Sequence, residues 1–137
     1  RGAFLEAIKA STSEMEECDV VVPRNLVAEF VKYTKQVERD VGVRLSGFGH
    51  AGDGNLHVYV LRDDFDPETY ARKLNESFDL LYAKARALGG QVSGEHGIGF
   101  AKKAFLAESL GEVSINLLRS IKRAFDPNGI LNPGKVC

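Results

Sequence analysis

The segment at residues 43–64 most strongly limits how this chain can fold. Two extended runs, VRLSGFGH and LHVYVLRDD, flank the short sequence AGDGN. Asp-Gly and Gly-Asn pairs tolerate the positive φ angles of a tight reversal, and residues 56–61 are rich in residues that favour strands. The pattern therefore predicts a β-hairpin, and the fold must contain an antiparallel sheet built around it.

A helix is predicted on each side of this hairpin. The first has Asn25 as its cap, carries apolar residues at helical spacing to about Val41 and ends at Gly42. The second begins at Asp66-Pro67-Glu68, with proline in its first position and an acidic first turn, and ends at Gly89-Gly90.

Short strands are expected before the first helix and after the second. Residues 19–23, DVVVP, are a β-branched run closed by proline, and residues 91–93 precede the sequence GEHGIG. The order strand–helix–strand, strand–helix–strand is the split-βαβ or ferredoxin-like pattern. The expected fold is therefore α+β, ferredoxin-like, with a four-stranded antiparallel sheet and helices on one face.

The other segments are a helical stub at residues 3–10, a C-terminal helix over about 110–125 and an extended tail. The C-terminal helix ends where Asp126-Pro127-Asn128-Gly129 breaks the pattern. Its apolar residues recur at helical spacing and are expected to face inward: Val113, Leu117, Leu118, Ile121 and Phe125.

The composition excludes several classes of protein. A net charge of -1 does not suit a nucleic-acid binder, and no apolar run approaches the roughly 20 residues that span a bilayer. Cys18 and Cys137 do not form a disulfide framework or a CxxC motif, so a reducing, cytoplasmic compartment is expected. The length of 137 residues suits one domain over residues 1–137.

All three histidines lie in two glycine-rich segments, GHAGDGNLH and SGEHGIG. His50 and His57 flank the hairpin turn, so paired strands would set the imidazoles opposite each other, about 4.5–5.5 Å apart at Cβ. That arrangement suits two ligands of one divalent metal ion, and Glu95 can add a carboxylate from the neighbouring strand. His96 would point away from Glu95 in a regular strand, but the flanking glycines allow a bend that brings both into one pocket.

Plainer interpretations fit the same residues. A single histidine is most often a surface or hydrogen-bonded core residue, and Asp53 and Asn55 are common turn formers. Neither glycine-rich segment has GxGxxG spacing, and no GxxxxGK[ST] occurs, so a nucleotide-binding loop is not indicated. The residues alone leave both a metal or catalytic site and a purely structural role open.

Three ordered motifs make the pattern more specific. GHAGDGNLH at 49–57, SGEHGIG at 93–99 and DPNGILNPGKV at 126–136 resemble the C-terminal domain of the FAD-linked oxidases. RGAFLEAIKAS and DVVVP fit the same family, so the resemblance covers nearly the whole chain. This family includes D-lactate dehydrogenase, the glycolate oxidase flavin subunit and D-2-hydroxyglutarate dehydrogenase, within the vanillyl-alcohol oxidase superfamily.

The resemblance implies a role for each matching position. The ligands of a divalent metal (zinc, manganese or iron) would be His50, His57 and Glu95. The general base would be His96, the substrate-binding residues Asn55 and Arg1, and the residues near the flavin Asn132 and Lys135. Some dicarboxylate-specific members carry a second basic residue where this chain has Glu16, Glu17 and Cys18. This difference favours lactate or glycolate over 2-hydroxyglutarate.

The implied reaction is oxidation of a 2-hydroxy acid to a 2-oxo acid. The metal acidifies the hydroxyl group, His96 accepts the proton and hydride passes to FAD. An electron-transfer flavoprotein, a cytochrome or a quinone would take the electrons. The expected enzyme is cytoplasmic and at most peripheral to the membrane. A homodimer is one of its expected assemblies.

The flavin-binding domain is expected to lie outside this chain, so the chain alone should neither hold FAD stably nor turn over substrate. Two alternatives stay open: a non-catalytic small-molecule or metal-binding module, and an assembly module of ferredoxin-like fold.

Overall fold

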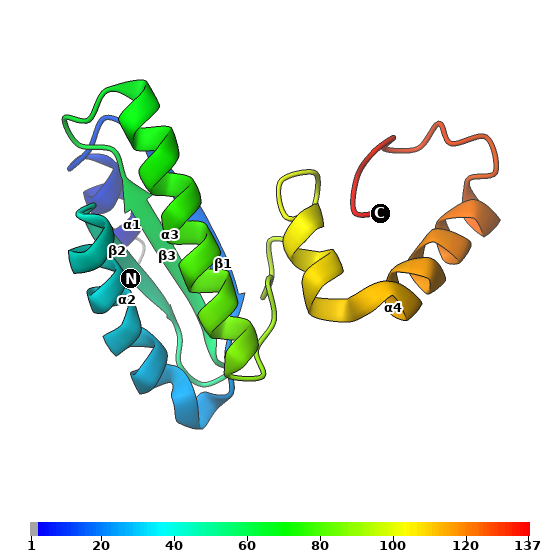
Figure 1. Cartoon of the computed structure of the whole chain (residues 1–137), viewed down its shortest axis with the longest axis horizontal. Coiled ribbons are helices and arrows are strands. Elements are labelled where there is room, and N and C mark those ends of the chain that lie inside the picture. Colours follow the sequence, from blue (N-terminus) through cyan, green and yellow to red (C-terminus); the bar gives the residue numbers. More distant parts are fainter. Residues whose placement is uncertain (1–2) are drawn as a thin grey trace. The chain divides into compact units, whose positions relative to one another are not determined.

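A computed structural model describes residues 3–137, which divide into two compact units between Glu95 and His96. The first unit has a mixed helix and sheet fold (Figure 1). Its elements follow in the order α1 (Ala3–Lys9), β1 (Met15–Val21), a 3-10 turn (Arg24–Leu26), α2 (Val27–Val41), β2 (Leu45–His50), β3 (Asn55–Leu61) and α3 (Pro67–Ala87).

Within residues 3–137 the strands form one antiparallel sheet in the order β1-β3-β2. The predicted hairpin is confirmed as β2 and β3, and β1 pairs with the other side of β3. Residues on paired strands alternate between the two faces of a sheet. The central strand β3 therefore delivers one set of side chains to the core and the other set to the opposite face.

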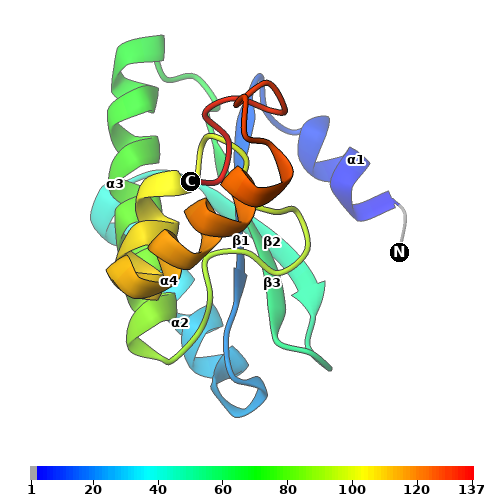
Figure 2. The same ribbon diagram turned by 90° about the vertical axis from the view of Figure 1, so that its right-hand side faces the viewer.

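The core of the first unit lies between the sheet and the helices α2 and α3, which cover the same face of the sheet (Figure 2). β1 and β3 contribute Cys18, Val20, Leu56, Val58 and Val60, and all five are buried. Phe30 and Val37 on α2, and Leu81 and Tyr82 on α3, are buried as well. Each such side chain stabilises the fold by about 1.5–3 kcal/mol relative to leaving it in water.

The helix ends show which local signals decide where a helix starts and stops. Asp66 caps α3 as expected: its carboxylate accepts from the backbone N–H of Glu68 and of Thr69, both at 3.0 Å. Gly42 ends α2 with φ 66°, a left-handed conformation that glycine adopts without steric cost. The expected cap Asn25 is wrong, because it lies inside the 3-10 turn and α2 begins at Val27 without a side-chain cap.

The expected fourth strand is reduced to a single bridge between Val21 and Gln91, at the free edge of β1. The four-stranded sheet is therefore not confirmed. Beyond Gln91 the backbone N–H groups bond to a side chain and do not pair with β1. The Asp19 carboxylate accepts from the N–H of Gly94 at 3.1 Å and from the N–H of Glu95 at 3.3 Å. Donors used in this way are not available to pair with β1, so the strand stops.

The second unit contains α4 (Lys103–Phe125), which is kinked at Gly111 with φ 74° and ψ 170°. The helix starts earlier than expected, and its buried residues are Leu106 and Ile115. The expected inward side chains are mostly exposed, as much as 85% for Val113 and 83% for Phe125, and that prediction is wrong. A unit of this size has too little chain to cover every apolar row of a long helix.

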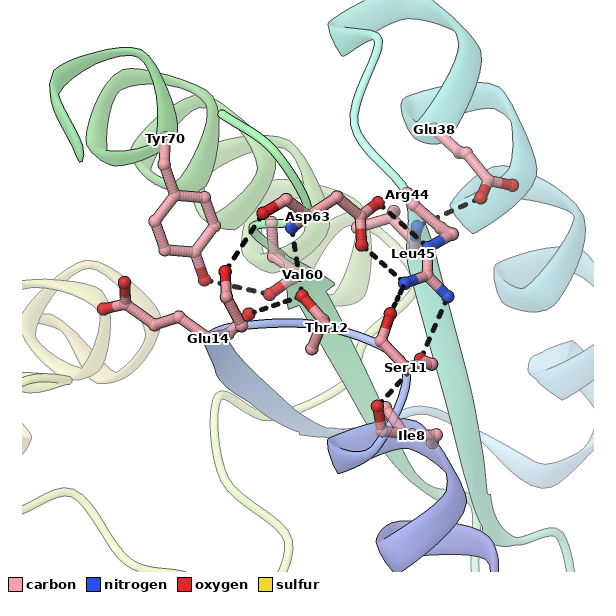
Figure 3. Close-up of polar contacts among 11 residues, drawn as sticks. Ile8, Ser11, Thr12, Glu14, Glu38, Arg44, Leu45, Val60, Asp63 and Tyr70 are labelled. Carbon is pink, nitrogen blue, oxygen red and sulfur yellow. Dashed lines mark hydrogen bonds and ion pairs between the residues drawn. The ribbon is translucent and has the colours of Figure 1, made fainter. Parts of the chain in front are cut away.

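The α1–β1 connection is held by a polar network (Figure 3). The Arg44 guanidinium binds both carboxylate oxygens of Asp63 and donates to the Ser11 carbonyl at 2.6 Å. Thr12 accepts from the Asp63 backbone N–H at 3.0 Å and donates to the Glu14 carbonyl at 3.0 Å. These bonds join the loop before β1 to the open end of the β2–β3 hairpin.

Replacing Asp63 by asparagine should lower the free energy of unfolding by about 1 kcal/mol at neutral pH, because this ion pair is half-exposed and screened by solvent. The hydrogen bond to Arg44 lowers the pKa of Asp63. Its stabilising contribution is therefore present above the ordinary carboxyl pKa and is lost as pH falls through the lowered value. Urea denaturation across the acid range measures both effects.

The neighbouring change Asp64→Asn is the matched control for charge. We expect the difference in stability between the native chain and Asp63→Asn to vanish at strongly acidic pH. An equal pH dependence for the two variants would contradict the assigned role of the Arg44–Asp63 pair.

Candidate metal centre

Polar side chains gather on the face of the sheet opposite α2 and α3. They alternate along the strands with the core residues, because successive side chains point to opposite faces. β1 contributes Glu17 and Asp19, and the hairpin contributes His50, Asn55, His57 and Tyr59. Four of these are almost fully buried: Asp19, Asn55, His57 and Tyr59.

The hairpin register decides how the two histidines meet. His50 pairs with Asn55, and His57 pairs with Phe48. The imidazoles are therefore diagonal neighbours and not directly opposite, because the turn takes up only residues 51–54. They still lie on one side of the hairpin, with ring centroids 5.8 Å apart and an interplanar angle of 83°.

Glu95 completes a cluster with these histidines. Its Oε1 lies 3.1 Å from Nε2 of His57 and 3.8 Å from Nε2 of His50. The three ligand atoms all lie within 4.8 Å of one another. The structure thus brings together residues of two separate motifs, since His50 and His57 lie in GHAGDGNLH and Glu95 lies in SGEHGIG.

Asp19 holds the segment that carries Glu95. Its carboxylate is 1% exposed and accepts from the backbone N–H of Gly94 and Glu95 and from the Ser93 hydroxyl at 3.0 Å. Hydrogen bonds to an ionised acceptor are about twice as strong as neutral ones. Asp19 therefore holds two successive backbone N–H groups, those of Gly94 and Glu95, in place.

The donor set of this cluster fits a divalent metal ion. Two imidazole nitrogens and one carboxylate oxygen are ligands that zinc, manganese and iron accept. A shared proton can bridge two of the three atoms, whereas a cation can contact all three at once. His57 is 3% exposed, and the side chains of His50 and Glu95 are 35% and 51% exposed, so a metal here would remain open to a ligand.

Glu17 lies behind His57 and was missed as a site residue by sequence reasoning. Its Oε1 is 2.7 Å from Nδ1 of His57, and its Oε2 accepts from the Tyr59 hydroxyl at 3.0 Å. Burial, together with this bond to Glu17, raises the pKa of Tyr59 well above its usual value, so the hydroxyl keeps its proton. No local motif marks Glu17; only its register opposite Tyr59 reveals the contact.

Asn55 offers a buried acceptor beside the cluster. It is 6% exposed, and among the described residues its Oδ1 has no hydrogen-bond partner. Leaving a buried acceptor unsatisfied costs about 1–3 kcal/mol. Such a group is well suited to accept a hydrogen bond from a bound ligand.

Three of the other expected site residues belong to the second unit, and the fourth lies outside the described residues. His96 is exposed and is the first residue of the second unit, while Arg1 lies outside the described residues. Asn132 and Lys135 are exposed on the second unit, where they line a hollow of about 530 Å³ with the apolar side chains of Leu118, Ile121 and Phe125. Their roles stay predictions.

A family model confirms the resemblance carried by the motifs. The model of the C-terminal domain of FAD linked oxidases matches residues 1–136. The chain belongs to this family. The match includes both histidine-bearing segments and the C-terminal tail.

Curated relatives of the chain are dehydrogenases or oxidases of hydroxy acids by name. The chain is 52% identical over its whole length to a D-lactate dehydrogenase of Anaerostipes hadrus. Over 86% of the chain it is 38% identical to the glycolate oxidase subunit GlcD of Bacillus subtilis. Over 80% it is 33% identical to a D-2-hydroxyglutarate dehydrogenase of Stutzerimonas stutzeri. The chain spans 29%, 25% and 25% of the lengths of these relatives, respectively.

Within residues 3–137, every helix is too short or too polar to cross a membrane.

Gly94 should tolerate no side chain, because a Cβ there would lie 2.4 Å from Oδ1 of Asn55. We expect Gly94→Ala to displace the Asn55 amide and to lower the free energy of unfolding by about 1–3 kcal/mol, as overpacking does. Urea denaturation and the NMR signals of the Asn55 side-chain amide measure these effects.

Gly52→Ala is the matched control, since a Cβ at that turn position meets nothing within 4 Å. Equal stability of the two alanine variants, with the Asn55 amide signals unmoved, would show that Gly94 does not confine Asn55.

Proposed function

We propose that this chain is the metal-binding part of an FAD-dependent 2-hydroxy-acid dehydrogenase of the D-lactate or glycolate type. The observation that carries the proposal is the convergence of His50, His57 and Glu95 within a chain of the FAD-linked oxidase family. The relatives named above act on hydroxy acids by their names, which supports the substrate class.

The three residues would hold the divalent ion at the face of the sheet. When bound, the ion supplies Lewis-acid chemistry: it polarises the hydroxyl and carboxylate oxygens of a 2-hydroxy acid. Because the Glu95 side chain is 51% exposed, substrate can approach the cluster from solvent. The buried His57, in contrast, would anchor the ion on the protein side.

Asn55 would orient the substrate. Its Oδ1 is an acceptor, and the hydroxyl group of a 2-hydroxy acid is a donor. The hydroxyl has one hydrogen, so its bond to this oxygen would hold the substrate on binding and would be exchanged for a bond to His96 before proton transfer. Arg1 would pair with the substrate carboxylate, as the family resemblance implies.

His96 would act as the general base. An imidazole ring can accept a proton on its unprotonated nitrogen, which is the chemistry a general base needs. Its backbone is one peptide bond from Glu95, so chain connectivity keeps it near the metal ligand. It would take the hydroxyl proton onto a ring nitrogen as the carbon–hydrogen bond breaks.

When bound, FAD would supply the hydride-acceptor chemistry that the oxidation of a 2-hydroxy acid needs. Asn132 and Lys135 are proposed as the contacts of this chain to the flavin, because they line a partly apolar hollow on the second unit. An electron-transfer flavoprotein, a cytochrome or a quinone would then reoxidise the flavin.

The charge beside the cluster supports a substrate with one carboxylate. Glu17 and Asp19 are acidic residues on the same face as the histidines. A second carboxylate on the substrate would be repelled there by about 1–4 kcal/mol per close pair, depending on the local dielectric. D-lactate and glycolate therefore fit better than 2-hydroxyglutarate.

Removing one ligand should separate metal binding from catalysis. In the full-length protein that contains this chain, His57→Ala should lose bound metal, since two ligands hold a divalent ion far less tightly than three. His96→Ala should retain the metal and lose turnover by about 10²–10⁴-fold, the usual contribution of a general base. Elemental analysis after dialysis and steady-state kinetics measure the two effects.

Absence of metal from the active, unmodified protein would refute the ligand assignment. Metal loss in His96→Ala as well as in His57→Ala would instead place His96 among the ligands and leave the base unassigned.

The substrate class has its own test. A screen of the full-length protein with a dye acceptor should give kcat/KM for D-lactate or glycolate at least about 10-fold above that for D-2-hydroxyglutarate, equivalent to about 1.4 kcal/mol of repulsion. A preference for the dicarboxylate would show that Glu17 and Asp19 do not control the substrate.

A further inference from the structure

We infer that Glu17 is a positioning residue that fixes the tautomer and ring orientation of His57 for metal binding. The inference rests on the proposed function, because it concerns the same cluster. Glu17 is not one of the three ligands: its Oε1 contacts Nδ1 of His57, on the opposite side of the ring from Glu95. It would therefore act through His57 and not on the ion itself.

The bonding at the two nitrogens of His57 supports this role. A neutral imidazole carries one N–H and one lone pair. At 2.7 Å, Nδ1 is close enough to donate a strong bond to the Glu17 carboxylate. The lone pair is then on Nε2, which lies 3.1 Å from Oε1 of Glu95. This tautomer directs the metal-binding nitrogen into the cluster.

Glu17 is itself held in place. Its second oxygen accepts from the Tyr59 hydroxyl at 3.0 Å, and Tyr59 is 4% exposed. The Tyr59 ring stacks on Phe48, with ring centroids 5.8 Å apart, and Phe48 also contacts the His57 ring at 5.4 Å. The carboxylate therefore has both oxygens engaged and is pre-organised behind His57.

The neighbouring acids have different positions. Asp19 binds the backbone before and at Glu95, so it orients the third ligand rather than the histidine. Glu16 is exposed and points to the other face of the sheet, since successive residues of a strand alternate. Glu16 therefore provides a control with the same chemistry, one residue away from Glu17.

The inference predicts graded losses of metal affinity in the chain. Glu17→Ala should weaken Zn²⁺ or Mn²⁺ binding about 10–100-fold, the usual effect of removing a group that orients a metal ligand. Glu17→Gln keeps an acceptor oxygen and should lose less. Tyr59→Phe, which frees one oxygen of Glu17 without removing it, should lose least, and Glu16→Ala should bind like the native chain. Competition with a chromophoric chelator measures these affinities.

A spectroscopic readout tests the orientation without metal. Multiple-bond ¹H–¹⁵N NMR spectra distinguish the tautomers of a histidine ring. We expect His57 to be protonated at Nδ1 in the native chain and in Glu16→Ala, and to populate both tautomers in Glu17→Ala. A variant with a merely local packing defect would not shift this balance.

The outcomes separate this inference from the proposed function. A native chain that binds metal, together with a Glu17→Ala variant of unchanged affinity and tautomer, would overturn the inference alone. A native chain and full-length protein that bind no metal would overturn the metal site itself. In that case an unchanged tautomer in Glu17→Ala would also reject the orienting role, whereas a mixed tautomer would leave Glu17 as the group that orients His57.

Discussion

The arrangement of the candidate site depends on the buried carboxylate of Asp19. A charge this far from solvent is stable only when hydrogen bonds replace its hydration. Here the replacement comes from the main chain at residues 94 and 95 and from the Ser93 hydroxyl. The same bonds limit the expected fourth strand to a single bridge and position Glu95 beside the histidines, so one interaction shapes both the edge of the sheet and the cluster.

The sheet serves two purposes because its central strand is buried on both faces. Every residue of β3 is buried, with Leu56, Val58 and Val60 facing the helices and His57 and Tyr59 facing the polar cluster. Packing against α2 and α3 makes the strand rigid, and a rigid strand holds functional side chains more accurately than a loop. The stability of the core is thus linked to the geometry of the candidate site.

Local patterns predicted the elements whose ends depend on nearby residues. The hairpin, the Asp66 cap and the Gly42 terminus are confirmed, because each involves bonds within a few positions. The fourth strand failed because Asp19, more than 70 positions away, takes its donors. The prediction that the apolar residues of α4 face inward was wrong. Their spacing shows that they lie along one side of a helix, but it does not show that the second unit contains residues that pack against that side.

The sequence by itself determined the family through its ordered motifs and the antiparallel hairpin through its turn residues, and it marked the candidate site residues. Only the tertiary structure decided how those residues meet. The diagonal relation of His50 and His57, and the contact of Glu17 with His57 across 40 positions, depend on strand register. Register is set by the packing of the whole sheet and by the length of the turn, and no short segment records it.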